Sequence, residues 1–242
     1  MKVIGSKKEI KEIFESLEKE TSDWTDDDTI KAIHKKILKQ KIRFPALEYF
    51  SELVFEAIPN KQLYKFLDKI IALDEIGSYT IAGKILQLNL KNDISGSHKK
   101  ANEYISKGNV WYACDIISER VLGVMLLEHP EKTIEINKKQ INSDNFWMVR
   151  SVGVATHLAT KWGLQKKYAK QQFELLLSKA DAKDYHAITG IGWAAKTIAK
   201  FHPDIIKQFE EELDSPNVKQ WFRTKVKIGL GRNYKYATKY TG

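Results

Sequence analysis

The chain has 242 residues, of which 43% are hydrophobic and 29% charged, a composition typical of a folded globular protein and not of a disordered chain. Forty Lys and Arg residues outnumber 31 Asp and Glu, and the formal net charge of +9 favours a polyanionic partner. We expect no membrane partner, because no run of about 18 apolar residues is present. Cys114 is the only cysteine. A single cysteine excludes an intrachain disulfide and a thiolate metal cluster, so a cytoplasmic protein is the default.

Apolar residues recur at three- and four-residue spacing along nearly the whole chain, and this periodicity predicts an all-α protein. The first such segment is amphipathic, unlike the apolar core of a signal peptide. Pro130 and Pro203 fit first-turn helix positions, and Asn109, Asp144 and Asn217 fit N-cap positions. The expected helices cover residues 8–20, 29–41, 45–58, 60–73, 79–90, 98–108, 111–129, 130–141, 145–162, 166–180, 185–201, 203–213 and 218–230.

The second half of the chain contains an internal repeat. The sequence His-Pro-Glu at 129–131 recurs as His-Pro-Asp at 202–204, 73 residues later. Trp147 and Arg150 recur as Trp221 and Arg223 at offsets of 74 and 73 residues. This interval is close to two helix pairs of roughly 35–40 residues each, near the lower edge of HEAT-type spacing. The repeat therefore predicts a right-handed α-solenoid of HEAT-like antiparallel helix pairs with a concave basic face.

Three successive candidates for inner helices of such a stack each carry a Trp and a polar residue in a mostly apolar context. The pairs are Trp111 with Asp115, Trp147 with Arg150, and Trp193 with Lys196. Small residues surround them, among them Gly153, Gly190 and Gly192, which would let a bulky partner or a backbone approach closely. The alternative is a Trp-rich core in which an Arg–Asp pair bridges neighbouring helices. Because three such pairs recur on successive helices, we favour a functional face over the Trp-rich core.

The C-terminal part of the chain is basic and aromatic. No acidic residue follows Asp214, and the cations there are interleaved with aromatic residues. A solvated basic end is one interpretation; contact with nucleic acid is the one that the charge of the whole chain favours. We expect DNA contacts from Trp147, Lys196, Lys219, Arg223, Lys225 and Lys227.

Three motifs carry a resemblance to a known family. They are WYACD at 111–115, FWMVR at 146–150 and GWAAKTIAKFHPD at 192–204. With them the chain resembles the AlkD family of HEAT-like DNA alkylation-repair proteins, over roughly residues 60–230. The resemblance implies one HEAT-like domain over residues 1–242, with divergent N-terminal helices at 1–59, the repeat core at 60–230 and a basic tail at 231–242. It also implies that Trp111, Asp115, Arg150 and Trp193 are lesion-site residues.

The resemblance implies a DNA glycosylase that releases positively charged N3- or N7-alkylated purines from double-stranded DNA. Alkylation weakens the glycosidic bond and lets the base leave neutral, so no general acid is required. Asp115 would stabilise an oxocarbenium-like sugar and place a water. Trp111 and Trp193 would attract the cationic base by roughly 0.5–2 kcal/mol. Arg150 would contact a flanking phosphate or hold Asp115 ionised.

No nucleotide-binding glycine loop and no zinc signature is present, so we expect neither cofactor nor metal. We expect a nucleoid-associated monomer. Two alternatives stay open. One is a non-catalytic HEAT-like binder of damaged or branched DNA, and the other is a helical-repeat scaffold for protein partners.

Overall fold

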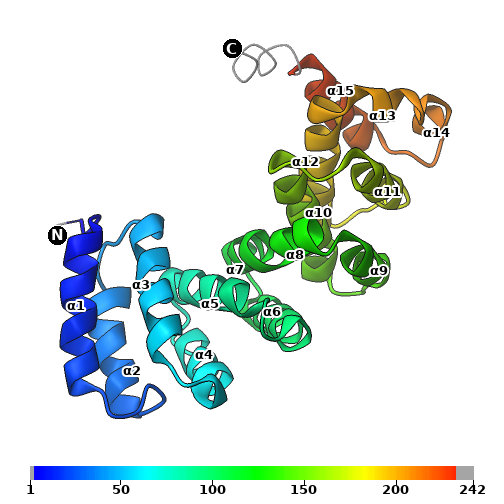
Figure 1. Cartoon of the computed structure of the whole chain (residues 1–242). Coiled ribbons are helices and arrows are strands. Elements are labelled where there is room, and N and C mark those ends of the chain that lie inside the picture. Colours follow the sequence, from blue (N-terminus) through cyan, green and yellow to red (C-terminus); the bar gives the residue numbers. More distant parts are fainter. Residues whose placement is uncertain (1–2, 233–242) are drawn as a thin grey trace. The chain divides into compact units, whose positions relative to one another are not determined.

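The computed structural model describes residues 3–232, and within them every regular element is a helix apart from one isolated parallel bridge between Ile4 and Ile42. The all-α prediction is confirmed. The chain forms two compact units, of which the first ends at Val121 and the second begins at Leu122 (Figure 1). Most of the predicted basic tail, residues 233–242, lies outside the described residues.

In the first unit α3 packs against α1 and α5, and α5 packs against α4, α6 and α7. Their bounds are α1 (Lys7–Glu20), α2 (Asp27–Ile33), the π-helix η1 (His34–Leu38), α3 (Phe44–Ala57), the short 3-10 helix η2 (Asn60–Gln62), α4 (Leu63–Ile71), α5 (Ile76–Asn89), α6 (Ile94–Gly108) and α7 (Trp111–Ile117). A second π-helix, η3 (Ser118–Leu122), follows α7, and the division between the units falls inside it.

An aromatic cluster joins the N-terminal helices of the first unit. Trp24 stacks on Phe14 with ring centroids 5.8 Å apart and meets the edge of Phe66 at 6.3 Å. Phe14 in turn meets Phe50 at 6.4 Å. All four rings are buried, so helices α1, α3 and α4 share one core with the Trp24 loop.

The second unit repeats a simple pattern in which one row of helices lies side by side and a second row covers it. In the first row α10 packs against α8 and α12, and α12 packs against α15; α9 and α11 belong to the covering row (Figure 1). The bounds are α8 (Gly123–Glu128), α9 (Pro130–Gln140), α10 (Phe146–Lys161), α11 (Lys166–Leu177), α12 (Tyr185–Phe201), α13 (Pro203–Lys207), α14 (Glu210–Asp214) and α15 (Gln220–Gly231).

The sequence repeat corresponds to a repeat of backbone conformation. His129 has φ −131° and ψ 56°, and His202 has φ −135° and ψ 63°. Each of the two His N–H groups donates to the carbonyl four residues earlier, at 2.8 and 2.7 Å. Pro130 and Pro203 then start α9 and α13 at a position that needs no N–H donor, as predicted.

The predicted N-caps were wrong in detail. Asn109 lies in the left-handed region at φ 47° and closes the C-terminus of α6 instead of opening α7. At α10 the capping side chain is Asn145, one residue after Asp144, and its Oδ1 accepts from the Trp147 N–H at 2.9 Å. Asn217 lies in a turn where the Val218 N–H donates to the Ser215 carbonyl, so α15 starts two residues later than that cap requires.

Glycines let the backbones of α10, α12 and α15 come into direct contact. A Cβ on Gly153 would lie 2.1 Å from the carbonyl carbon of Gly190, and one on Gly190 would lie 2.8 Å from the Arg150 Cα. At the next contact, a Cβ on Gly229 would lie 2.3 Å from the Lys196 carbonyl oxygen. Of the two purposes predicted for these small residues, close approach of a backbone is the one that the structure shows.

A side-chain hydrogen bond also joins α10 to α12. His157 Nδ1 lies 2.6 Å from Thr197 Oγ1, and the Thr197 hydroxyl donates to the Trp193 carbonyl at 2.8 Å. Burial first, and then the positive charges of Lys161 and Lys196, lower the pKa of His157 to about 4. His157 is therefore neutral near pH 7.

We predict that Gly153→Ala destabilises the second unit by about 3 kcal/mol, because the added methyl meets the backbone of α12 and forces the two helices apart. Gly231→Ala is the control, since nothing lies within 4 Å of a Cβ at Gly231. Urea unfolding followed by circular dichroism measures both. Equal midpoints for the two variants would contradict the close approach.

We also predict that His157 makes stability fall in acid. The unfolded chain protonates this imidazole near pH 6.5 and the folded chain only near pH 4, so the unfolded state binds more protons between these values. The free energy of unfolding should therefore drop by about 2 kcal/mol as the pH falls through this window. In His157→Asn this part of the pH dependence should vanish, which urea titrations at pH 7.5 and pH 5 would reveal. Parallel pH curves for the two proteins would disprove the assignment.

Candidate nucleic-acid interface and active-site residues

Helix α7 presents an exposed Trp and a buried carboxylate one turn apart in the first unit. Trp111 is the first residue of α7, and its side chain is 55% exposed. Asp115 follows four residues later and is only 7% exposed. The Trp111 ring meets Tyr112 edge-on with centroids 5.8 Å apart, and Tyr112 meets Tyr79 of α5 in the same way. One helix therefore offers an open aromatic face and, beside it, a carboxylate largely removed from water.

A tight reversal between α6 and α7 sets the start of this helix. Asn109 takes the left-handed conformation that the reversal requires. A Cβ on Gly108 would lie 2.7 Å from the Ala113 Cβ and 2.9 Å from the Tyr79 hydroxyl, so glycine is needed for the approach. These contacts hold α7 against the end of α6 and place Trp111 at the first helical position.

The π-helix η3 directly follows Asp115's helix, a feature that the sequence did not reveal. Arg120 within it donates to the Ile116 carbonyl at 3.2 Å and to Glu48 Oε1 of α3 at 2.6 Å. The Arg120 side chain is 13% exposed and that of Glu48 35%, so this ion pair is only partly shielded from water; it ties η3 to α3. Wide turns of this kind are frequent at functional sites, where they alter the direction of neighbouring side chains.

In the second unit the side chain of Arg150 lies over the indole of Trp193. The Arg150 guanidinium carbon lies 5.3 Å from the Trp193 ring centroid, a cation–π arrangement. Arg150 Nη1 also donates to the His186 carbonyl at 3.4 Å, and the residue is 3% exposed. Arg150 therefore links α10 to the first turn of α12 and lies over the Trp193 indole.

Trp147, expected to contact DNA, is 4% exposed. Its ring centroid lies 4.3 Å from that of His186 and 4.9 Å from that of Phe146. These contacts favour a packing role at the start of α10. Contact between Trp147 and DNA stays a prediction.

Five basic side chains, carried by α10, α12, α15 and the residue that follows α15, act on one another electrostatically, and we call them the cation cluster. They are Lys161, Lys196, Lys200, Lys225 and Arg232. Burial lowers the pKa of Lys196, and the nearby charges of Arg232 and Lys225 lower it further. Within residues 3–232, no carboxylate lies at ion-pair distance from Lys161, Lys196 or Lys225. The cluster is thus a concentration of positive charge, and a bound polyanion would reduce the repulsion among its members.

The sequence predicted two members of the cation cluster, Lys196 and Lys225, and missed the other three. Lys161 ends α10, Lys200 lies in the last turn of α12, and Arg232 follows α15. Basic residues at helix C-termini interact favourably with the helix dipole, so each looked like a local feature of its own helix. What could have revealed them is that a basic residue recurs at the C-terminal end of three helices in the same row.

The remaining predicted DNA contacts differ among themselves. Arg223 donates from Nε to the Leu213 carbonyl at 2.7 Å and from Nη2 to the Ser215 carbonyl at 2.8 Å, so its guanidinium closes the loop before α15. Lys219 and Lys227 are exposed at the start and in the middle of α15. DNA contact by these three residues stays a prediction.

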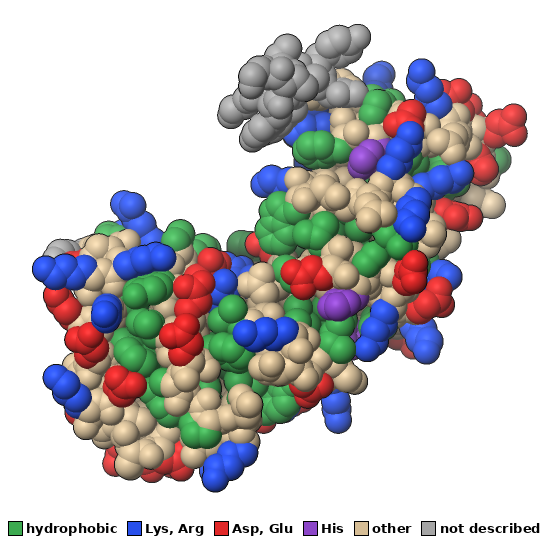
Figure 2. Space-filling model, viewed as in Figure 1, with side chains coloured by type: hydrophobic (Ala, Val, Ile, Leu, Met, Phe, Trp, Pro, Cys, Tyr) green, Lys and Arg blue, Asp and Glu red, His purple; other side chains and the backbone are tan. Residues whose placement is uncertain are grey.

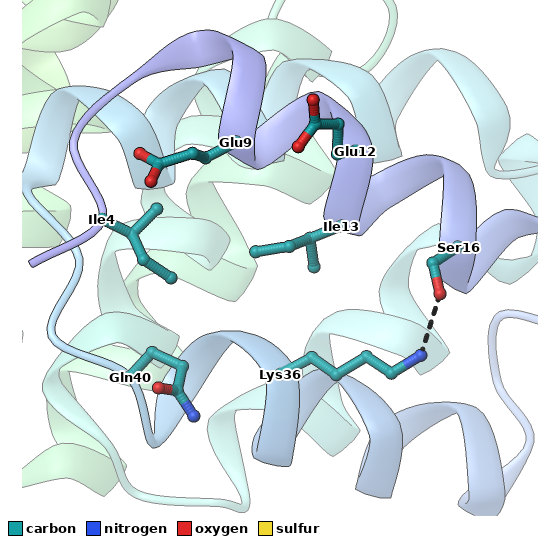
Figure 3. Close-up of a pocket in the computed structure, with 7 residues that line it drawn as sticks. All are labelled: Ile4, Glu9, Glu12, Ile13, Ser16, Lys36 and Gln40. Carbon is teal, nitrogen blue, oxygen red and sulfur yellow. Dashed lines mark hydrogen bonds between the residues drawn. The ribbon is translucent and has the colours of Figure 1, made fainter. Parts of the chain in front are cut away.

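A cavity of about 550 Å³ lies elsewhere, on the first unit between α1 and η1 (Figure 3). It is lined by Ile4, Glu9, Glu12, Ile13, Ser16, Lys36 and Gln40. Lys36 Nζ donates to Ser16 Oγ at 3.1 Å and is also paired with Glu20. No predicted site residue lines this cavity, and its two carboxylates make it a poor site for phosphate.

The surface drawn in Figure 2 carries acidic side chains among the basic ones, so positive charge does not cover that face evenly. Among residues 3–232, no group of His, Cys, Asp and Glu side chains is arranged to hold a metal ion. No helix in the described part is both long enough and apolar enough to cross a membrane.

Comparison of the sequence with known protein families gives one match. The family model described as DNA alkylation repair enzyme covers residues 30–229, which include all three motif segments and also residues 30–59. No curated protein matches the chain. Because the family model spans well over half of the sequence, the chain belongs to the family of DNA alkylation repair enzymes, the AlkD-type family that its Trp-Asp and Trp-Arg motifs predicted.

Proposed function

We propose that this protein is a DNA glycosylase that excises positively charged N3- or N7-alkylated purines from duplex DNA. The observation that carries the proposal is the family match over residues 30–229, which spans Trp111, Asp115, Arg150 and Trp193. The burial of Asp115 beside the open ring of Trp111 supports it, because a shielded carboxylate next to an aromatic face suits a cationic substrate.

The reaction needs one carboxylate and one water. The alkylated purine carries a positive charge, so the bond between C1′ and the base nitrogen breaks with both electrons going to the base, which leaves neutral. Positive charge develops on the sugar, and Asp115 stabilises it electrostatically. The same carboxylate orients a water, whose oxygen bonds to C1′ while its proton is taken up by the carboxylate or by solvent. The products are the free base and an abasic site.

Recognition of the lesion rests on aromatic faces. Trp111 is the more open of the two proposed Trp contacts, since more than half of its surface is exposed. Trp193 already has the Arg150 guanidinium 5.3 Å from its ring centroid. A cationic base interacts with the quadrupole of an indole ring more favourably than a neutral base does. Trp111 is therefore the first aromatic contact that we propose for the lesion.

The cation cluster is the part of the second unit that we propose to bind the DNA backbone. Its members come from three helices that lie side by side, and such a row is what the inner helices of a HEAT-like solenoid form. Contacts between lysines and phosphates release counterions, which gives affinity without sequence preference. Binding should therefore be similar for any duplex sequence and should weaken steeply as salt is added.

We predict that Asp115→Asn lowers the release of 7-methylguanine and 3-methyladenine from methylated duplex DNA by about 100-fold or more, because the neutral amide no longer stabilises the sugar cation. DNA affinity should be retained. Asp144→Asn, which removes the same charge at an exposed position, is the matched control and should be fully active. Equal activity of Asp115→Asn and wild type would refute the role of Asp115. A wild type that binds DNA in a salt-sensitive way but releases no base would be the non-catalytic DNA binder.

We predict that Lys196→Gln weakens binding to damaged and undamaged duplex equally and reduces the slope of log affinity against log salt by about 0.9, the contribution of one phosphate contact. Lys8→Gln, an exposed lysine of α1, removes one charge outside the cluster and should leave the slope unchanged. Fluorescence anisotropy across a salt series measures both. Identical slopes for the two variants would exclude Lys196 from the DNA interface.

A further inference from the structure

Two side chains of α10 flank the indole of Trp193. Arg150 and His157 are seven residues apart, about two helical turns, and therefore lie on the same face of α10. The Arg150 guanidinium lies 5.3 Å from the Trp193 ring centroid, and the centroid of the His157 imidazole lies 6.0 Å from it with the ring planes tilted by 50°. Arg150 has an expected role in the proposed function, whereas His157 has none.

Thr197 fixes the orientation of the His157 ring. The Thr197 hydroxyl proton is committed to the Trp193 carbonyl, so its oxygen accepts the hydrogen bond from His157 Nδ1–H at 2.6 Å. The imidazole is thereby fixed as the Nδ1–H tautomer. Thr197 lies one turn beyond Trp193 on α12, so the hydrogen bond ties the imidazole to the helix that carries the indole.

Burial and the positive charges around His157 keep its ring neutral. The charged groups that act on it are Lys161 on its own helix and Lys196 and Lys200 on α12, and all three are cations. Burial and these lysines hold the pKa of His157 at about 4, so the ring does not titrate between pH 5 and 8. A neutral aromatic ring restricts the indole without adding a cation that would compete with a charged base.

We propose that His157 is a positioning residue that, through its hydrogen bond to Thr197, holds the Trp193 indole in one orientation opposite Arg150. The consequence for substrate selection rests on the proposed function, since it concerns Trp193 as a lesion contact. His157 acts through Trp193 and not on the base. Arg150 and His157 both contact the Trp193 indole from α10 and restrict its orientation. Under the proposed function, Trp193 therefore meets the DNA in one preset orientation and does not adjust to each base.

The test observes Trp193 directly in the full-length protein labelled with 5-fluorotryptophan. The Trp193 fluorine resonance is assigned with Trp193→Phe. His157→Ala and Thr197→Val should shift or broaden it, whereas the resonance of Trp24, in the aromatic core of the first unit, should stay unchanged. Thr160→Val is the matched control, because the buried Thr160 hydroxyl on α10 has no hydrogen-bond partner within the described residues. An unchanged Trp193 resonance in both His157→Ala and Thr197→Val would overturn the inference.

Excision kinetics give a second, independent measurement. His157→Ala should lower the single-turnover rate of 7-methylguanine release about tenfold at unchanged DNA affinity, since small misplacements of a substrate contact cost rate more than binding. His157→Asn, whose side-chain amide can still donate to Thr197 Oγ1, should recover part of the rate, whereas His157→Phe, which keeps a ring but has no donor, should stay slow. A rate that falls equally in His157→Phe and Thr160→Val would point to general damage and contradict the role. If the wild type releases no base, the proposed function fails, and the fluorine spectra still decide whether His157 positions Trp193.

Discussion

The candidate site of the second unit depends on the contact between the backbones of α10 and α12 at Gly153 and Gly190. At that point no side chain separates the helices, and the Arg150 backbone also lies against Gly190. Arg150 precedes Gly153 by three residues, and Trp193 follows Gly190 by three. The glycine contact therefore sets the distance between the two backbones from which these side chains extend toward each other. A wider spacing between the helices would separate the guanidinium from the indole and stretch the bond from His157 to Thr197. Two residues without side chains thus determine how Arg150 and Trp193 are placed.

Periodicity and helix-boundary residues predicted the helices well, because both are local properties of the sequence. The helix at 185–201 was predicted with the bounds that α12 has. Helix α6 begins at Ile94, earlier than predicted, because the Asp93 carboxylate accepts from the Gly96 N–H at 2.8 Å and draws a loop-like Ser-Gly-Ser stretch into the first turn. The π-helices at His34–Leu38 and Ser118–Leu122 escaped prediction, since a wider turn depends on packing with other helices and not on composition.

The sequence named polar and aromatic residues for the candidate site, but it could not predict what surrounds them. Trp111 and Trp147 occupy similar motifs, yet one is 55% exposed and the other 4%, because Phe146 and His186 enclose only the second. Arg223 and Lys225 belong to one basic stretch, yet Arg223 donates to two loop carbonyls while Lys225 lies across Gly192 and joins the cation cluster. Partners contributed by distant parts of the chain decide these outcomes, and no local pattern contains them.

The proposed substrate poses an electrostatic problem that the distribution of charge resolves. DNA is a polyanion, so a protein that holds it benefits from positive charge, but a cationic base is repelled by the same charge. In this chain Lys161, Lys196 and Lys225 of the second unit belong to the cation cluster, while the motif with the most exposed Trp pairs it with a carboxylate and no lysine. Asp115 and Trp111 both interact favourably with positive charge, the first through its negative charge and the second through its ring quadrupole. A carboxylate beside a Trp in a chain of net charge +9 is therefore what selective binding of a cation within a polyanion requires.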